Sequence, residues 1–102
     1  MPARIAGYWR GVLTGPHGEE PALVEFAQRF QTASATVWLP HWNMAGSGHI
    51  RGEQISLSLK PSSPLLSSKP LSFTLHTTQD RLEGEAVDGG QRYVLRATRL
   101  AE

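Results

Sequence analysis

The residue types most able to do chemistry gather in VWLPHWNMAGSGHIR, which spans residues 37–51. This stretch holds two of the three tryptophans, Trp38 and Trp42, and two of the four histidines, His41 and His49. Imidazoles can bind a metal or transfer protons, and indoles can cover an apolar ligand. The stretch is therefore a candidate for a catalytic centre, a metal site or the mouth of a ligand site.

The side chains with catalytic potential do not form a recognisable constellation. Zinc needs three or four ligands, and no further histidine or carboxylate has a metal-site spacing from His41 and His49. Glu83 and Glu85 share one face of a predicted strand, as solvated carboxylates do. The GSG at 46–48 lacks the preceding strand and following helix that expose a nucleophilic serine. We predict no catalytic residue, no metal and no cofactor, and hence a protein that is not an enzyme.

The composition argues against several classes of partner. The chain has 102 residues, with ten Lys and Arg against nine Asp and Glu, and a formal net charge of +1. Nucleic acids and anionic membranes attract a concentrated basic surface, whereas the basic residues here are scattered from Arg4 to Arg99. The absence of cysteine excludes disulfides, iron–sulfur clusters and thiol nucleophiles. We therefore predict neither a nucleic-acid nor a membrane partner.

The length suits one domain, which we assign to residues 1–102. The amino terminus, MPARIAGYWRG, lacks the apolar core of a signal peptide. No apolar run approaches the roughly 18 residues that a transmembrane helix needs. We expect a cytoplasmic protein, or a domain taken from a longer chain.

Apolar and polar residues alternate with a period of two along most of the chain, which is typical of strands with one buried face. The DGG at 88–90 has the composition of a tight hairpin turn. The segment 22–30 also fits a helical period, but its alternation favours a strand that buries Phe26 and Phe30. The eight predicted strands are 5–14, 22–30, 34–40, 48–52, 53–60, 71–78, 81–87 and 91–100.

The connections between these strands are too short for the crossovers that parallel strands need, so the sheet is predicted to be antiparallel. The longest is the proline- and serine-rich segment 61–70, and 41–48 is expected to be an extended rim connection. Eight antiparallel strands leave no edge when they close. The predicted fold is all-β, an eight-stranded antiparallel up-and-down β-barrel, with a two-sheet β-sandwich as the alternative.

In a closed barrel the first strand pairs with the last, which would bring Trp9 beside Arg99. Both side chains lie on the predicted inner faces of their strands, and a guanidinium stacks favourably on an indole. Gly7 and Gly11 leave room for the ring on the same face as Trp9. We expect Gly7, Trp9 and Arg99 to close one end of the barrel.

The Gly-x-Trp of the first strand and the basic residue of the last resemble the calycin superfamily, which includes the lipocalins and avidins. The chain is also similar to a small β-barrel module found beside bacterial hydrolase domains, whose first strand reads G-x-W-x-G-x-L. The resemblance implies a calycin-like barrel, but nothing after Trp9 matches the biotin-gripping residues of avidins. The matching positions are Gly7, Trp9, Gly11, Leu13, Pro40, Gly52, Ile55, Leu57, Asp80, Leu82, Gly84, Leu95, Ala97 and Arg99.

The favoured function is non-enzymatic binding of a small apolar or amphipathic ligand at one end of the barrel, because barrel mouths are common ligand sites. At the rim, Trp42 and Met44 would form either a lid over the ligand or a plug in the core. A catalytic barrel would need titratable groups on its inner face, where the alternation places almost none. The predicted ligand contacts are Trp9, Phe26, Trp42, Met44, Phe73, Leu75 and Tyr93.

The outer face suggests an alternative function. If the terminal strands pair, large apolar residues occupy neighbouring outer positions, which exceeds what a solvated strand face usually carries. These residues are Tyr8, Val12, Leu23 and Val94. The alternative is a ligand-free structural or interaction module that forms a homodimer, or docks on another domain, through strands one, two and eight.

Overall fold

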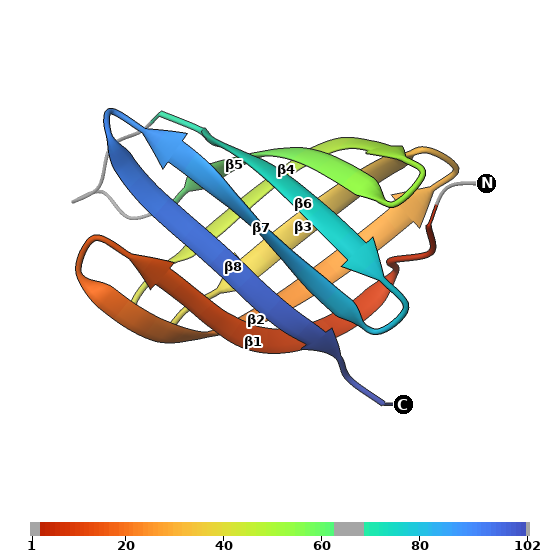
Figure 1. Ribbon diagram of the computed structural model, residues 1–102, viewed down its shortest axis with the longest axis horizontal. Helices are drawn as coiled ribbons and strands as arrows, with labels where there is room; N and C mark the ends of the chain where they lie inside the picture. The colour runs from red at the N-terminus through yellow and green to blue at the C-terminus, as the bar shows by residue number, and fades with distance from the viewer. Residues whose placement is uncertain (1–2, 63–68, 102) are drawn as a thin grey trace.

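The computed structural model describes residues 3–62 and 69–101, which fold into eight β-strands (Figure 1). Their bounds are β1 Gly7–Gly15, β2 Gly18–Arg29, β3 Thr32–Trp38, β4 Asn43–Arg51, β5 Gln54–Pro61, β6 Leu71–Thr78, β7 Arg81–Asp88 and β8 Gln91–Arg99. The all-β prediction is confirmed, and the segment with two possible periods is a strand. No helix within these described ranges is long and apolar enough to cross a bilayer.

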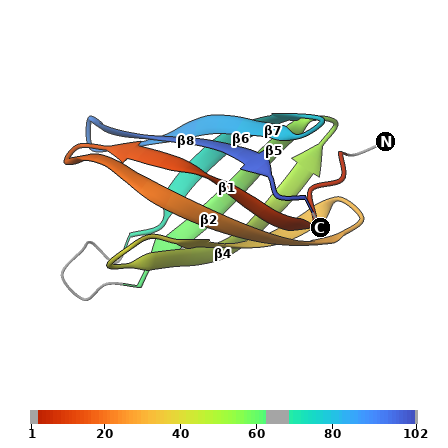
Figure 2. The same ribbon diagram turned by 90° about the horizontal axis from the view of Figure 1, so that it is seen from below.

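The sheet closes on itself. Each strand pairs antiparallel with the next one along the chain, and β1 also pairs with β8 (Figure 1, Figure 2). A closed ring offers no edge strand to a second chain, which removes a common cause of aggregation. The predicted up-and-down barrel is confirmed, and the sandwich alternative is wrong because the strands form one closed sheet.

The barrel interior is packed with apolar side chains. Inward positions alternate with outward ones, so Trp9 is fully buried between the exposed Tyr8 and Arg10. The largest side chains that lose essentially all contact with water are Trp9, Phe73, Ile5, Leu13, Met44, Ile50, Ile55, Leu59, Leu75, Leu82, Leu95 and Val24. Burying them supplies the main driving force for closing the sheet.

Strand β4 lies unusually close to β5 because two of its inward positions are glycines. A Cβ atom added to Gly46 would lie 1.8 Å from the Ser58 carbonyl oxygen, and one added to Gly48 would lie 1.7 Å from the Ser56 carbonyl oxygen. Such distances are far inside van der Waals contact, so neither position accepts a side chain. The GSG at 46–48 is therefore strand backbone that approaches its neighbour closely.

Two predicted connections are longer than those in the structure. The rim connection expected over 41–48 is short, because β4 begins at Asn43 and the chain turns within 39–42. The loop expected between the first two strands reduces to a turn at Pro16 and His17. The 61–70 connection lies partly outside the described residues.

Phe30 was expected to face the core, and it does not. It follows the end of β2 in a two-residue turn, with a φ of 56° and 83% of its surface exposed. Arg29 pairs with Thr32 on the other side of this turn. The chain reverses one residue before the alternation would bring the Phe30 ring inward.

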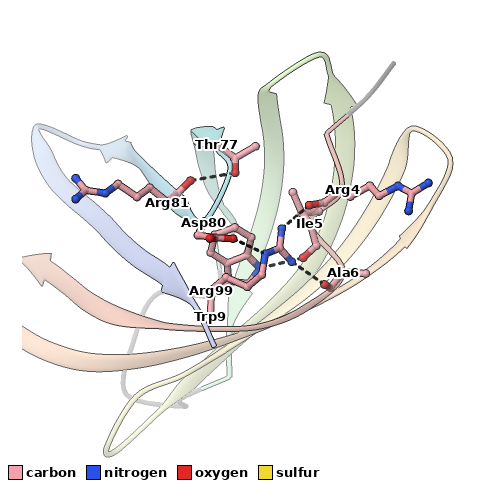
Figure 3. Close-up of polar contacts among 8 residues, drawn as sticks. All are labelled: Arg4, Ile5, Ala6, Trp9, Thr77, Asp80, Arg81 and Arg99. Atoms are coloured by element: carbon pink, nitrogen blue, oxygen red, sulfur yellow. Dashed lines mark hydrogen bonds and ion pairs between the residues drawn. The ribbon is translucent and has the colours of Figure 1, made fainter. Parts of the chain in front are cut away.

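Trp9 and Arg99 meet at one end of the barrel, as predicted (Figure 3). The two residues are Cα partners in the β1–β8 ladder, and the guanidinium carbon of Arg99 lies 4.4 Å from the centre of the indole ring. The indole also meets the Phe26 ring edge to face, with centroids 6.4 Å apart. The cation therefore covers a buried aromatic ring at this end of the core.

Gly7 and Gly11 do not make room for the Trp9 ring as expected. Gly7 has a positive φ of 117° with open space where a Cβ atom would lie, and Gly11 lets the Arg96 carbonyl oxygen approach.

The Arg99 guanidinium also binds the segment that enters β1. It donates hydrogen bonds to the carbonyl oxygens of Arg4 (2.6 Å) and Ala6 (3.1 Å), and its Nε lies 3.4 Å from Asp80 Oδ1 (Figure 3). Trp9 Nε1 donates to the Ile5 carbonyl oxygen at 2.9 Å. These bonds hold residues 3–6 across the barrel end.

Ile5 fills the core at this end of the barrel. Its side chain is fully buried in the core, and its backbone N–H donates to Gln28 Oε1 at 2.8 Å. Gln28 Nε2 in turn donates to the Ala3 carbonyl oxygen at 2.9 Å. A glutamine near the end of β2 thus gives the entering backbone the hydrogen bonds that a strand neighbour would otherwise supply.

We expect Arg99→Gln to lower the free energy of unfolding by about 2–3 kcal/mol, because it removes a cation–π contact and two charge-assisted hydrogen bonds. Arg99→Lys should retain part of the stability, since an ammonium keeps the charge but not the planar fork. Urea unfolding measures both. The exposed Arg96→Gln is the control and should change stability by less than about 0.5 kcal/mol. Equal losses at the two positions would contradict the closing role of Arg99.

Candidate interaction surface

The structure does not bring the histidines of the 37–51 stretch together. His41 precedes β4 and His49 lies near its far end, and both are exposed. The six residue steps from Asn43 to His49 alone extend about 20 Å along a strand. His17 and His76 are also exposed, in a turn and on the outer face of β6. Among the described residues, no three His, Asp or Glu side chains gather closely enough to hold a metal ion.

The two neighbouring carboxylates of β7 point into solvent, as predicted. Glu85 pairs with Arg92 at 2.8 Å, and Glu83 lies 3.9 Å from Arg96 Nε, both across the β7–β8 ladder. All four side chains are largely exposed. Exposed pairs of this kind contribute little to stability. This arrangement is that of a solvated outer face and not of a general acid and base.

The predicted ligand contacts lie inside the barrel, but five of them are already covered by protein. Trp9, Phe26, Met44, Phe73 and Leu75 keep at most 3% of their surface exposed. A side chain that lines a space large enough for water retains accessible surface against that space. The interior is therefore filled next to these five side chains.

Trp42 and Tyr93, the other two predicted contacts, are half-buried and pack against the core. Trp42 Nε1 donates a hydrogen bond to Glu20 Oε2 at 3.2 Å, and the Trp42 carbonyl oxygen accepts one from the Leu39 N–H at 2.9 Å. These bonds fix the turn between β3 and β4 with the indole against the core. Of the two roles considered for Trp42, this position corresponds to the plug.

The outer surface over β3–β6 carries small hydroxyl side chains. Ser34, Ser47, Ser58 and Ser72 are successive partners in the strand register, so they form one row across four strands. A shallow hollow of about 750 Å³ lies over this row and its neighbours. Sequence reasoning missed this row, because the alternation places each serine outside but does not give the register that aligns them. Water satisfies such hydroxyls well, so this face gains little from being covered.

The outer surface over β1–β3 and β8 is different, because it exposes large apolar side chains. Tyr8 is 46% exposed, Val12 37% and Trp38 38%, while Leu23 and Val94 are half-buried on the same outer side. Pro21 adds a further exposed apolar group. We call Tyr8, Val12, Pro21, Leu23, Trp38 and Val94 the outer patch. Tyr8, Val12, Leu23 and Val94 lie on the outer side of the barrel, as predicted. Pro21 and Trp38 were not predicted to belong to this surface.

The strand register places the members of the outer patch next to one another. Leu23 lies between Arg10 of β1 and Trp38 of β3, and Val12 lies opposite Pro21. Outward residues on adjacent strands are within side-chain contact distance directly and diagonally. The apolar groups therefore form a connected surface that surrounds Arg10.

Charged residues border the outer patch on its β7–β8 side. A hollow of about 540 Å³ there is lined by Arg10, Arg81, Arg96 and Glu83, with Thr98 between the arginines. An apolar centre with a charged rim is the usual anatomy of a protein–protein interface. The geometry of this face is thus suited to contact with protein.

Tyr8 and Glu25 are cross-strand partners in the middle of this surface. A side-chain hydrogen bond to Glu25 and the negative charge of that carboxylate raise the pKa of Tyr8 above its ordinary value. The neutral phenol is the donor in this bond, so loss of its proton places two negative charges side by side. Tyr8 therefore stays protonated well into the alkaline range.

No protein-family model, curated protein or solved structure gives a significant match to this chain.

We expect Phe73→Ala to lower the free energy of unfolding by about 3–5 kcal/mol, the range for removing a large side chain from a filled core. Urea unfolding measures the change. Phe30→Ala is the matched control, because its ring is exposed, and should change stability by less than about 0.5 kcal/mol. A loss below about 2 kcal/mol for Phe73→Ala would indicate open space beside the ring and contradict a filled interior.

Glu25→Gln should lower the pKa of Tyr8, because the neutral amide removes the neighbouring negative charge that disfavours the phenolate. Alkaline titration of the phenolate absorbance measures this, and Tyr8→Phe identifies which of the two tyrosine transitions belongs to Tyr8. Glu83→Gln is the control and should leave that transition in place. An unchanged Tyr8 transition in Glu25→Gln would show that the two side chains do not interact.

Proposed function

We propose that this protein is a non-catalytic interaction module, a filled β-barrel that docks on another protein surface through the outer patch. The observation that carries the proposal is the combination of a packed interior with large apolar side chains left in water. Tyr8 is 46% and Trp38 38% exposed, although their aromatic rings are apolar and gain little from contact with water. Covering such groups is the main favourable term in protein association.

The same face contains the residue types that contribute most to the binding energy of protein interfaces. Tyr, Trp and Arg dominate the residues that contribute most to protein interfaces, and Tyr8, Trp38 and Arg10 lie within one connected surface. Each square ångström of apolar surface covered is worth roughly 25 cal/mol before the cost of association. The hydroxyl face over β3–β6 lacks comparable groups, which supports the outer patch as the docking side.

Ligand binding within the barrel stays a prediction. It would require a small apolar molecule to displace core side chains, or to settle at the end where Trp42 and Tyr93 are half-buried. The filled interior favours the interaction function over this one. Calycin-like identity is part of our proposal too, and its support is the Trp9–Arg99 contact that closes the barrel.

A photo-crosslinking amino acid at Val12, expressed in the source cell, tests the interaction function. We expect an adduct of defined mass that disappears when Leu23→Lys is added, because a buried lysine charge opposes docking. The same crosslinker at Ser58, on the hydroxyl face, is the control and should give no such adduct. Identical adducts from both positions, or adducts unaffected by Leu23→Lys, would contradict docking through the outer patch.

A further inference from the structure

We infer that the partner of the outer patch is a second copy of this chain, related by a two-fold axis that runs along the diagonal from Tyr8 to Leu23. This inference rests on the proposed docking function and identifies the partner that docks on the outer patch. It is carried by the order of side chains on β1, β2 and β3, which is complementary to itself about this line. A two-fold interface requires this property, because the same surface must serve both partners.

The centre of the surface is a group of four outward residues on β1 and β2. Tyr8 lies opposite Glu25, and Arg10 lies opposite Leu23. The two apolar residues therefore occupy one diagonal of the group, and the two opposite charges occupy the other.

Two copies that meet face to face have their two-fold axis in the contact plane. Each residue then meets the residue at the mirror position across the axis. With the axis on the Tyr8–Leu23 diagonal, these two residues meet their own counterparts in the other copy. Arg10 of each copy faces Glu25 of the other, so the pair contains two identical ion pairs, each between one arginine and one glutamate.

The next residues outward also match. Taking strands about 4.8 Å apart and successive outward residues about 6.7 Å apart along a strand, the mirror position of Arg10 lies about 3 Å from Glu25. On the same spacing the mirror position of Pro21 lies about 3 Å from Trp38. Long side chains span such offsets. An indole on a proline ring is a favourable apolar contact, and it too occurs twice in the pair.

The Arg10 guanidinium is available for an ion pair with a second copy. The Arg92, Arg96 and Arg99 side chains have acidic neighbours in their own chain, but among the described residues no carboxylate forms an ion pair with Arg10. Its position among apolar groups makes this cation a poor centre for a partner without a matching anion. A second copy supplies Glu25 at that place.

The inferred pair also has a plausible size. A specific interface takes about 800 Å² from each partner. That is roughly an eighth of the 6665 Å² surface of this chain. The covered surface would be centred on the β1–β2 group and would extend equally to both sides of the axis, because each side of one copy meets the opposite side of the other.

Reciprocal charge reversal tests the inference on the purified protein by sedimentation equilibrium. Arg10→Glu places two glutamates against two glutamates, and Glu25→Arg does the same with arginines. Each variant alone should dimerise at least about tenfold more weakly than the wild type, because like charges in a contact are costly. An equimolar mixture of the two should form a heterodimer within about threefold of the wild-type affinity, since every contact again joins opposite charges. Recovery in the mixture also demonstrates that both variants fold.

A matched pair of reversals away from the outer patch is the control. Arg51→Glu and Glu53→Arg change the same charges on exposed residues near the β4–β5 turn, and neither should alter the dissociation constant. Weakening by these control variants equal to that of the patch variants would assign the effect to net charge and overturn the inference.

The outcomes separate this inference from the proposed function. A wild-type chain that stays monomeric at high concentration, or a mixture of variants that fails to recover, overturns the two-fold pairing. The docking function survives that result if the Val12 crosslinker still gives an adduct with a different protein that Leu23→Lys removes. A monomeric chain with no such adduct overturns both.

Discussion

The contact between the Trp9 indole and the Arg99 guanidinium joins the two strands whose pairing closes this sheet into a barrel. Trp9 and Arg99 face each other across the β1–β8 ladder, which is the pairing that converts an open sheet into a ring. Arg99 also holds residues 3–6 across the end of the core, so one side chain joins three parts of the chain. A cation that covers an aromatic ring can do this where an apolar residue would leave the backbone carbonyls unsatisfied.

The interior of this barrel is packed, and its outer surface is divided into two chemically different faces. Small barrels are either packed with side chains or hollow enough for one ligand. Here Trp9, Phe73 and Met44 are buried in the packed interior. The outer surface then divides into a row of serine hydroxyls over β3–β6 and a connected apolar surface over β1–β3 and β8. The second of these has both the aromatic groups and the alternating charges from which an interface can be built.

The sequence predicted the all-β class, the antiparallel closure and the Trp9–Arg99 contact, because the alternation of apolar and polar residues and the short connections between strands can be read from the order of residues. It did not predict which outer residues become neighbours. The expected turn after residue 30 was one residue too long, and the actual turn at Phe30 places Leu23 beside Trp38. Register depends on turn length, and a shift by one residue changes every cross-strand pair. The serine row and the full outer patch both depend on which residues are cross-strand partners. Neither could therefore be predicted without the register of the strands.

The order of strands has a consequence for biosynthesis. Because β1 is bonded to β8, one side of β1 stays without its partner strand until β8 has left the ribosome. Until residue 99 emerges, β1 presents unpaired backbone groups on one side, and the Trp9 indole has no cation above it. The ring therefore closes only after β8 has emerged, and a chain truncated before β8 would keep two open edges that can pair with other nascent chains.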